Sequence, residues 1–191
     1  MTMVVAIALI ASSVFFISLM PVLKQVRATN AFNLSLATLR RAHDQAVAQK
    51  GVLLVTFTAP RTITVAQSNA AACQAGSQTA TWFNGLTTTL PSDMSFTADS
   101  NLPTSAPDGF GSGKVAIDFG QGVGGGATQL YFCPDGSARD VNNNLNNGVV
   151  YMERSGDLYS SRAITVWGSS GRIRGWRLDS TSGGTLFWRQ Q

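Results

Sequence analysis

The hydrophobic pattern of this chain changes twice along its length. Residues 1–23 carry no charged side chain and are apolar almost throughout. In residues 24–50 apolar side chains recur every three or four positions, the spacing of one helix face, with no proline or glycine. About 20 apolar residues span a bilayer. We therefore predict an N-terminal helix over residues 1–50, with a transmembrane part at 1–23 and an amphipathic part at 24–50.

Two residues refine this prediction for the helix. Pro21 lies inside the apolar run, where its missing amide hydrogen predicts a kink in the membrane helix without ending it. Gly51 follows the last helical position and is typical of a helix C-terminus. A helix of about 50 residues is about 75 Å long. Its first half therefore extends beyond a domain of this size and needs lipid or partner helices around it.

After Gly51 the pattern changes to short runs rich in β-branched and aromatic residues, separated by turn residues. Residues 52–58 and 62–66 flank Pro60 and predict a hairpin. We predict an α+β, pilin-like fold, in which the long N-terminal helix packs on an antiparallel, two-sheet C-terminal domain. That β-rich domain covers residues 51–191. Its further predicted strands are 79–83, 94–98, 114–119, 127–132, 148–154, 162–167, 171–178 and 184–189.

Charge is scarce and unevenly placed. Charged residues are 13% of the chain, against about 25% in an average soluble domain. The formal net charge of +4 hides a +4 over residues 1–50, a −4 over residues 51–159 and a +4 over residues 160–191. The last of these segments concentrates arginine, and a local basic cluster attracts phosphate or another acidic partner.

The arginines near the C-terminus form the sharpest candidate site. Arg172 and Arg174 share a face of a strand because alternate side chains point the same way, and Trp176 joins them if no bulge intervenes. Guanidinium groups beside an indole suit phosphates and a stacked base, and Arg177 and Arg162 could widen such a surface. The alternative is a solvated strand face, or arginines paired with acids elsewhere in the chain.

The two cysteines, Cys73 and Cys133, lie in the β-rich part. In an exported domain they form a disulfide, which would stabilise the fold by about 4 kcal/mol in the chain-entropy model. The alternative is a pair of small unbonded apolar residues, because the sequence does not place their Cβ atoms.

Residue types that carry catalysis are sparse. His43 is the single histidine, and no nucleophile lies beside it in a recognisable arrangement. The glycine-rich stretch 120–128 lacks the Lys-Ser/Thr of a phosphate loop. One histidine and two distant cysteines do not make a usual zinc site. We expect no enzyme activity, no cofactor and no metal.

Several landmarks in order resemble the GspH/FimT family of type II secretion pseudopilins and type IV minor pilins. They are VVAIALIASSVFFISLMP, LATLRRAHDQAVAQKG, LYFCPDGSARD and RAITVWGSSGRIRGWRL. The resemblance implies a minor pilin or pseudopilin with a structural role in filament assembly. It implies an inner-membrane, single-pass protein whose domain lies in the periplasm or on an extracellular filament, with other pilin subunits as partners.

The same resemblance implies an alternative function, and the chain differs from the family pattern at its N-terminus. A Gly-Arg-x-Arg segment such as 171–174 is associated in FimT-like proteins with DNA binding during natural transformation. Family members also begin with a basic leader, a Gly, a Phe and a Glu, and a prepilin peptidase cleaves and methylates them. No such Gly is present here, and no acid precedes Asp44. We interpret Met1 as an internal start position.

Overall fold

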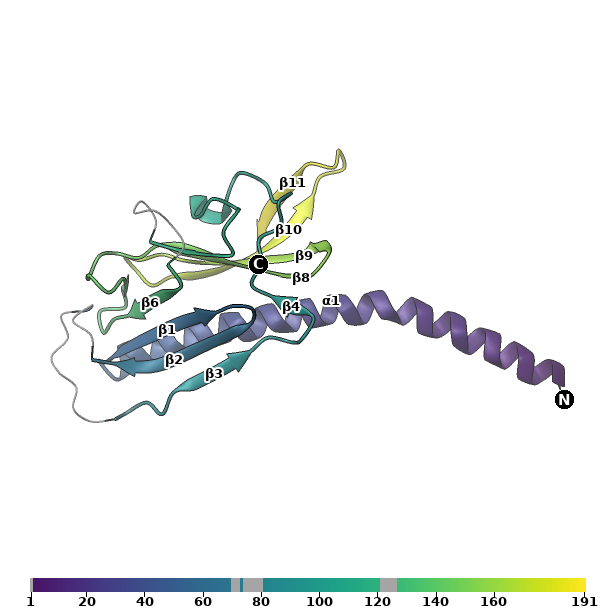
Figure 1. Ribbon diagram of the computed structural model, residues 1–191, viewed down its shortest axis with the longest axis horizontal. Helices are drawn as coiled ribbons and strands as arrows, with labels where there is room; N and C mark the ends of the chain where they lie inside the picture. Colours follow the sequence, from purple (N-terminus) through teal and green to yellow (C-terminus); the bar gives the residue numbers. More distant parts are fainter. Residues whose placement is uncertain (1, 70–72, 74–80, 121–126) are drawn as a thin grey trace.

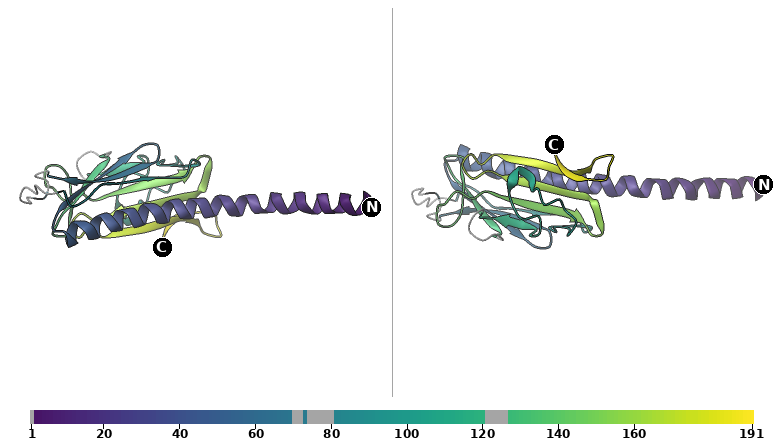
Figure 2. Two further views of the ribbon diagram at one scale, coloured as in Figure 1. Left: turned by 90° about the horizontal axis from the view of Figure 1, so that it is seen from below. Right: turned by 90° about the horizontal axis from the view of Figure 1, so that it is seen from above.

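The computed structural model describes residues 2–69, 73, 81–120 and 127–191, with side chains described from residue 25 onward. The chain begins with helix α1, Thr2–Ala48, and continues mainly in strands (Figure 1). In two further views the helix runs alongside the strands and then extends beyond them toward the N-terminus (Figure 2). The N-terminal part of α1 therefore projects from one end of the domain.

The described half of α1 buries one narrow stripe. Ala28, Phe32, Leu39, Ala42 and Ala46 are each at most 2% exposed, at the three- and four-residue spacing of a single helix face. Most of these side chains are small, so the helix backbone can approach the strands closely. Ala31, Ser35 and Thr38 are also buried on this face, and the other positions from residue 25 onward are partly or fully exposed.

The helix ends two residues earlier than its predicted end at residue 50. The last helical residue is Ala48, and Lys50 adopts a left-handed conformation with φ of 49°. The amide of Gly51 donates to the carbonyl oxygen of Ala46 at 3.0 Å. A Cβ atom on Gly51 would lie 2.0 Å from the Trp82 ring. Glycine is required at position 51 because the Trp82 ring packs directly on its backbone. The left-handed conformation that ends the helix belongs to the preceding residue, Lys50.

One sheet has five strands in the order β3-β2-β1-β6-β7. The hairpin of β1 and β2 is followed along the chain by the short polar strand β3, and β6 and β7 complete the other side. All of its pairings are antiparallel. The bounds are Val52–Thr58 for β1, Thr62–Ser68 for β2, Leu86–Thr89 for β3, Gln129–Phe132 for β6 and Ala138–Arg139 for β7.

The other sheet has six strands. Five of them follow the order β11-β10-β9-β8-β4, and the sixth, β5, also pairs with β8. Its central strands are long, and β9 is joined to β8 by a tight hairpin with a register shift between Met152 and Arg154. The bounds are Met94–Ser95 for β4, Ile117–Phe119 for β5, Gly148–Arg154 for β8, Asp157–Val166 for β9, Ile173–Ser180 for β10 and Leu186–Gln190 for β11.

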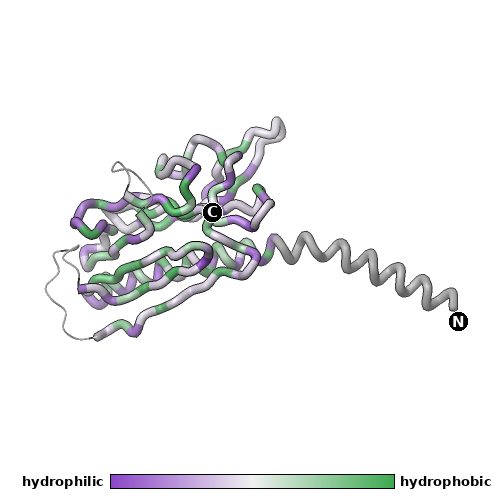
Figure 3. Tube along the Cα trace, in the orientation of Figure 1, coloured by the Kyte–Doolittle hydropathy of each residue, from purple (hydrophilic) through white to green (hydrophobic). Residues whose placement is uncertain are grey.

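The main core lies between the two sheets and the buried stripe of α1. Side chains from all three join one cluster, including Phe32, Val55, Phe119 and Ile164. Hydrophobic segments accordingly appear on strands of both sheets (Figure 3). A smaller cluster around Tyr151, Trp176 and Trp188 covers the opposite face of the six-stranded sheet. That sheet is thus buried on both faces over much of its length.

The predicted fold class, an α+β fold in which a long helix packs on a two-sheet domain, is wrong. The described fold is mostly strands, in two antiparallel sheets of five and six strands. The described part of the helix, 25–48, contributes a narrow stripe to the core that the sheets share, and it does not form a layer of its own. The physical reason is that strand side chains fill most of that core, which leaves room for small residues of the helix.

The predicted localisation is also corrected. Among residues whose side chains are described, which begin at residue 25, no helix is long and apolar enough to cross a membrane. This finding contradicts the predicted single-pass inner-membrane protein with a periplasmic or extracellular domain. The predicted transmembrane part, 1–23, and the kink expected at Pro21 fall outside the described side chains.

Several strand predictions are confirmed, and others are wrong. The strands at 52–58 and 148–154 have the predicted bounds. The described residues of the segment 79–83, which are 81–83, form no strand, and β3 lies a few residues later. The residues of β3, LTTT, include three β-branched threonines that favour a strand, but the run is short and does not alternate between apolar and polar residues. Pairing with β2 forms this strand.

Candidate functional site

Strand β10 presents its predicted site residues on opposite faces. The pairing of β10 with β9 runs in unbroken register from Ile173 to Arg177. Without a bulge, Arg174 and Trp176 share the face that carries the smaller cluster, whereas Gly175 and Arg177 face the main core. The register therefore decides which side chains act together.

Asp108 is the centre of a polar network on the first of these faces. Its side chain is 5% exposed and pairs with Arg174, with 2.7 Å between Nη1 and Oδ1. The other carboxylate oxygen accepts hydrogen bonds from Thr165 Oγ1 at 2.6 Å and from Trp167 Nε1 at 3.1 Å. Thr165 Oγ1 in turn accepts from Trp176 Nε1 at 3.0 Å. The charge of Arg174 is thus compensated inside the molecule.

Arg172 extends this face toward solvent. Its guanidinium carbon lies 4.9 Å from the centroid of the Trp167 ring, the geometry of a cation–π contact. Trp167 also makes an edge contact with Phe110, with ring centroids 4.9 Å apart. Arg172 is exposed. The face therefore carries one exposed arginine on an aromatic support, next to an ion pair.

The remaining predicted arginines lie on the face toward the helix. Arg162 of β9 is directly opposite Arg177 of β10, and Arg189 of β11 is opposite Arg177 on its other side. Arg162 is 2% exposed. Burial, and then the neighbouring charge of Arg177, lowers the pKa of Arg162 to about 10. Arg162 and Arg177 therefore do not widen the surface of Arg172 and Arg174.

Sequence reasoning missed three members of the polar network: Asp108, Thr165 and Trp167. Asp108 is 66 residues from Arg174 along the chain, and it lies in a short 3-10 turn, Pro107–Gly109. Its φ of 55° is left-handed, a conformation that Asp tolerates better than most residues. The one local signal was an acid in a Pro-Asp-Gly turn, which by itself indicates turn formation.

His43 has a structural role at the C-terminal half of α1. Its Nε2 lies 3.1 Å from the carbonyl oxygen of Gly136, and its ring makes an edge contact with Phe132. A Cβ on Gly171 would come within 2.5 Å of the His43 ring and 2.2 Å of the Gly136 oxygen. The helix, the β6–β7 turn and the β9–β10 turn therefore meet at this histidine, in contacts too close for a larger residue at 171.

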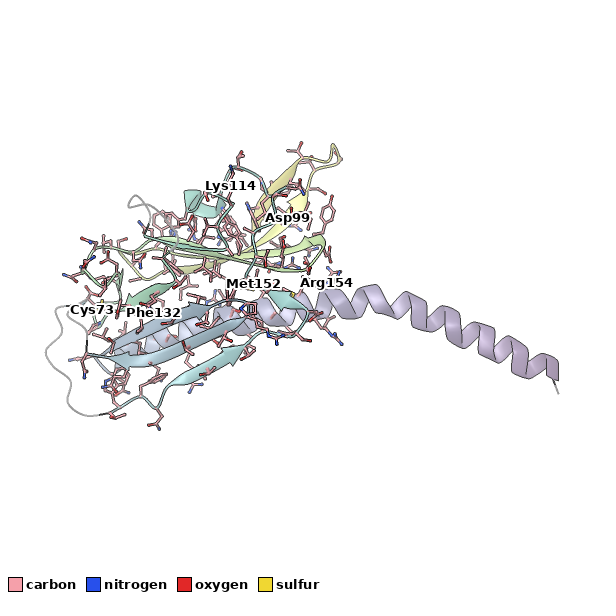
Figure 4. All side chains as sticks on the ribbon, in the orientation of Figure 1. Cys73, Asp99, Lys114, Phe132, Met152 and Arg154 are labelled. Atoms are coloured by element: carbon pink, nitrogen blue, oxygen red, sulfur yellow. A yellow bond between two sulfur atoms is a disulfide. The ribbon has the colours of Figure 1, made fainter. Side chains whose placement is uncertain are left out.

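Cys73 and Cys133 are joined by a disulfide, with 5.5 Å between their Cα atoms. Figure 4 shows Cys73 beside Phe132, at the end of β6. The bond links positions 60 residues apart in sequence. It ties the segment after β2 to the turn that follows β6, next to the contacts of His43.

The outer surface of α1 is a second candidate. Val26, Leu34 and Val47 are 48%, 46% and 40% exposed. An open hollow runs along one flank of the helix, lined by Asn33, Leu36, Ala37, Arg40, Arg41, Asp44 and Gln45. This surface mixes apolar and charged side chains on a rigid helix, which suits contact with another protein. In the described part of the chain, no group of three or more His, Cys, Asp or Glu residues could hold a metal ion.

Comparisons with known proteins give little beyond these observations. No protein-family model and no curated protein matches the chain. Among solved structures, the chain is similar to the minor pseudopilin EpsH from the type 2 secretion system of Vibrio cholerae, at 14% identity and a TM-score of 0.35. The match covers 86% of this chain and 97% of that chain.

Proposed function

We propose that this chain is a structural subunit of a filament, of the minor pilin or pseudopilin class found in type II secretion systems and type IV pili. The observation that carries the proposal is that helix α1 is longer than the domain against which it packs. Helix α1 spans Thr2–Ala48, and in the described part its buried stripe begins at Ala28. A helix that extends well beyond its own domain is suited to packing between subunits.

The exposed face of the described helix supports the same role. Leu34 and Val47 point away from the core although both are apolar, and Arg40, Arg41 and Asp44 lie between them in sequence. Apolar anchors with polar residues around them are typical of a protein–protein interface. The family landmarks in the sequence imply the same class of subunit. The chain acts in this proposal through contacts, without catalysis.

DNA binding through 171–174 has weaker support and stays a prediction. Arg174 is paired with Asp108, and Arg162 and Arg177 lie on the opposite face of the sheet. This leaves Arg172 as the exposed cation of the predicted segment. A phosphate backbone is usually bound by several uncompensated cations. We therefore prefer the filament role.

Site-specific photo-crosslinking in the cells that encode the protein tests the proposal. A benzophenone amino acid at Leu34 or Val47 should give discrete crosslinked species that contain other pilin-like subunits. The matched control is Val141, an exposed apolar residue away from the helix at 62% exposure, which should give far less product. Equal yields at all positions, or none at the helix positions, would sink the proposal.

A further inference from the structure

Arg162 and Arg177 face each other across two neighbouring strands. They are directly paired positions of β9 and β10, so their Cβ atoms are about 4.5–5.5 Å apart. Both side chains lie on the sheet face toward α1, because Ile164 belongs to the main core and Gly175 packs against Phe32. Like charges directly opposite each other destabilise a sheet unless something compensates them.

In the part of the chain that the structure describes, no carboxylate forms an ion pair with either arginine, although the charge of Asp157 is close enough to act on Arg162. Arg162 is 2% exposed, and its Nη1 donates to the carbonyl oxygens of Ser161 and Tyr159 at 3.0 and 3.3 Å. The Nε atoms of Arg162 and Arg177 are both buried without a hydrogen-bond partner. Arg177 makes no ion pair or hydrogen bond in the part of the chain that the structure describes.

The two acids beside this pair already have partners. Asp157 pairs with Arg154, and Asp179, two residues after Arg177 in β10, pairs with Arg189. Arg154 lies at the end of the domain from which the helix extends (Figure 4). Met152, two residues before Arg154 on β8, is paired with Arg162 of β9. Arg162 and its neighbour Arg177 therefore lie toward the same end of the sheet as Arg154. Two cations with unused N–H donors therefore remain side by side on the sheet face toward α1.

We propose that Arg162 and Arg177 form a binding site for one phosphate group. Guanidinium groups bind phosphate oxygens through paired N–H donors. A phosphate group carries up to two negative charges and can neutralise both arginines, whereas a carboxylate carries one charge and can neutralise only one of them. The burial of Arg162 restricts the ligand to inorganic phosphate or the terminal phosphate of a small ester. A duplex phosphodiester is too bulky to reach it. This inference does not depend on the filament role.

Phosphate titration of the full 191-residue chain tests the site. The affinity is measured by isothermal titration calorimetry at constant ionic strength, with chloride as the replaced anion. Wild-type protein should bind one equivalent of inorganic phosphate and gain thermal stability as phosphate rises, because a ligand that binds the folded state stabilises it. Glycerol 3-phosphate is the second arm: equal or tighter binding than phosphate indicates an ester ligand, and weaker binding indicates free phosphate.

Two variants identify the residues. Arg177→Gln should weaken phosphate binding at least tenfold, whereas the matched control Arg189→Gln should change it less than twofold, because Arg189 lies in the same row of the sheet but pairs with Asp179. If Arg177→Gln does not fold, the side-chain Nε–H signals of wild-type Arg162 and Arg177 are followed by NMR and should shift with phosphate. Absence of phosphate-specific binding, or equal affinity in both variants, would overturn the proposal.

Discussion

Arg174 donates to the buried carboxylate of Asp108 at 2.7 Å, and this ion pair joins the turn at 107–109 to the start of β10. Asp108 also binds Thr165 and Trp167. One carboxylate therefore fixes two strands and a loop. The arrangement also explains why an arginine singled out as a DNA-binding candidate is engaged within the molecule.

Asp108→Asn tests the stabilising role of this carboxylate. Asn keeps one oxygen acceptor and tolerates the left-handed backbone at this position, so the change mainly removes the ion pair and a charged acceptor. We expect a loss of about 2 kcal/mol in the free energy of unfolding, measured by urea denaturation. The control, Asp179→Asn, breaks a more exposed pair with Arg189 and should cost less than about 1 kcal/mol. Equal losses would contradict the central role of Asp108.

Gly175→Ala should destabilise the contact between helix and sheet. A Cβ at this position would lie 2.3 Å from Cζ of Phe32, so the buried ring must shift. We expect a loss of about 1 to 3 kcal/mol from overpacking, measured by thermal or chemical unfolding. The control is Gly183→Ala, where the nearest atom to the new Cβ lies at 3.8 Å, and the change should stay within about 0.5 kcal/mol.

A second variant separates overpacking from other effects at Gly175. Phe32→Leu removes the ring that the new methyl group meets, so the double variant should lose less than the sum of the two single losses. Additive losses would show that Gly175 is needed for a reason other than its contact with Phe32.

The raised pKa of Glu153 predicts that the stability of the protein depends on pH. Its side chain is buried, and burial, followed by the nearby charges of Asp99 and Asp157, raises its pKa despite a hydrogen bond from Ser161. The folded protein then holds this proton at pH values where the unfolded chain has lost it. Stability from this group therefore falls as pH rises from the unfolded pKa through the higher folded pKa.

Glu153→Gln removes that titration. The variant should gain stability relative to wild type as pH rises from about 4, near the unfolded pKa of Glu, to 7. The measurement is the difference in free energy of unfolding between the two proteins across this range. Groups that do not interact with Glu153 titrate equally in both proteins and cancel, so the difference reports Glu153 and its coupling to Asp99 and Asp157. A difference that is constant with pH, or that changes in the opposite direction, would refute a raised pKa for Glu153.

The disulfide between Cys73 and Cys133 should contribute strongly to stability, because it closes a loop over 60 positions of sequence. Replacing both cysteines with serine should lower the free energy of unfolding by about 4 kcal/mol in the chain-entropy model. Denaturation with and without a reductant checks this, and the double serine variant should not respond to the reductant. Unchanged stability of wild-type protein after its thiols are shown to be free would contradict the prediction.

Local patterns predicted much of the secondary structure. The apolar runs at 52–58 and 148–154 form strands with the predicted bounds, because each buries one or both faces in a continuous sheet. Strand β9 begins at Asp157, several residues before the predicted start at 162. Its early residues, DLYSS, are mostly polar, and their strand conformation comes from the hairpin with β8. Short-range polarity alone could not show this.

The sequence by itself determined the α1 helix that continues past residue 25, the main β runs and the alternation that sets Arg174 and Trp176 on one face, since these follow from residue spacing. Tertiary structure decided how the sheets share their core, that Arg174 pairs with Asp108, and that Arg162 lies buried opposite Arg177. These depend on strand register and on contacts between residues far apart in the chain. Their energies arise only when the sheets are assembled, so no local pattern carries them.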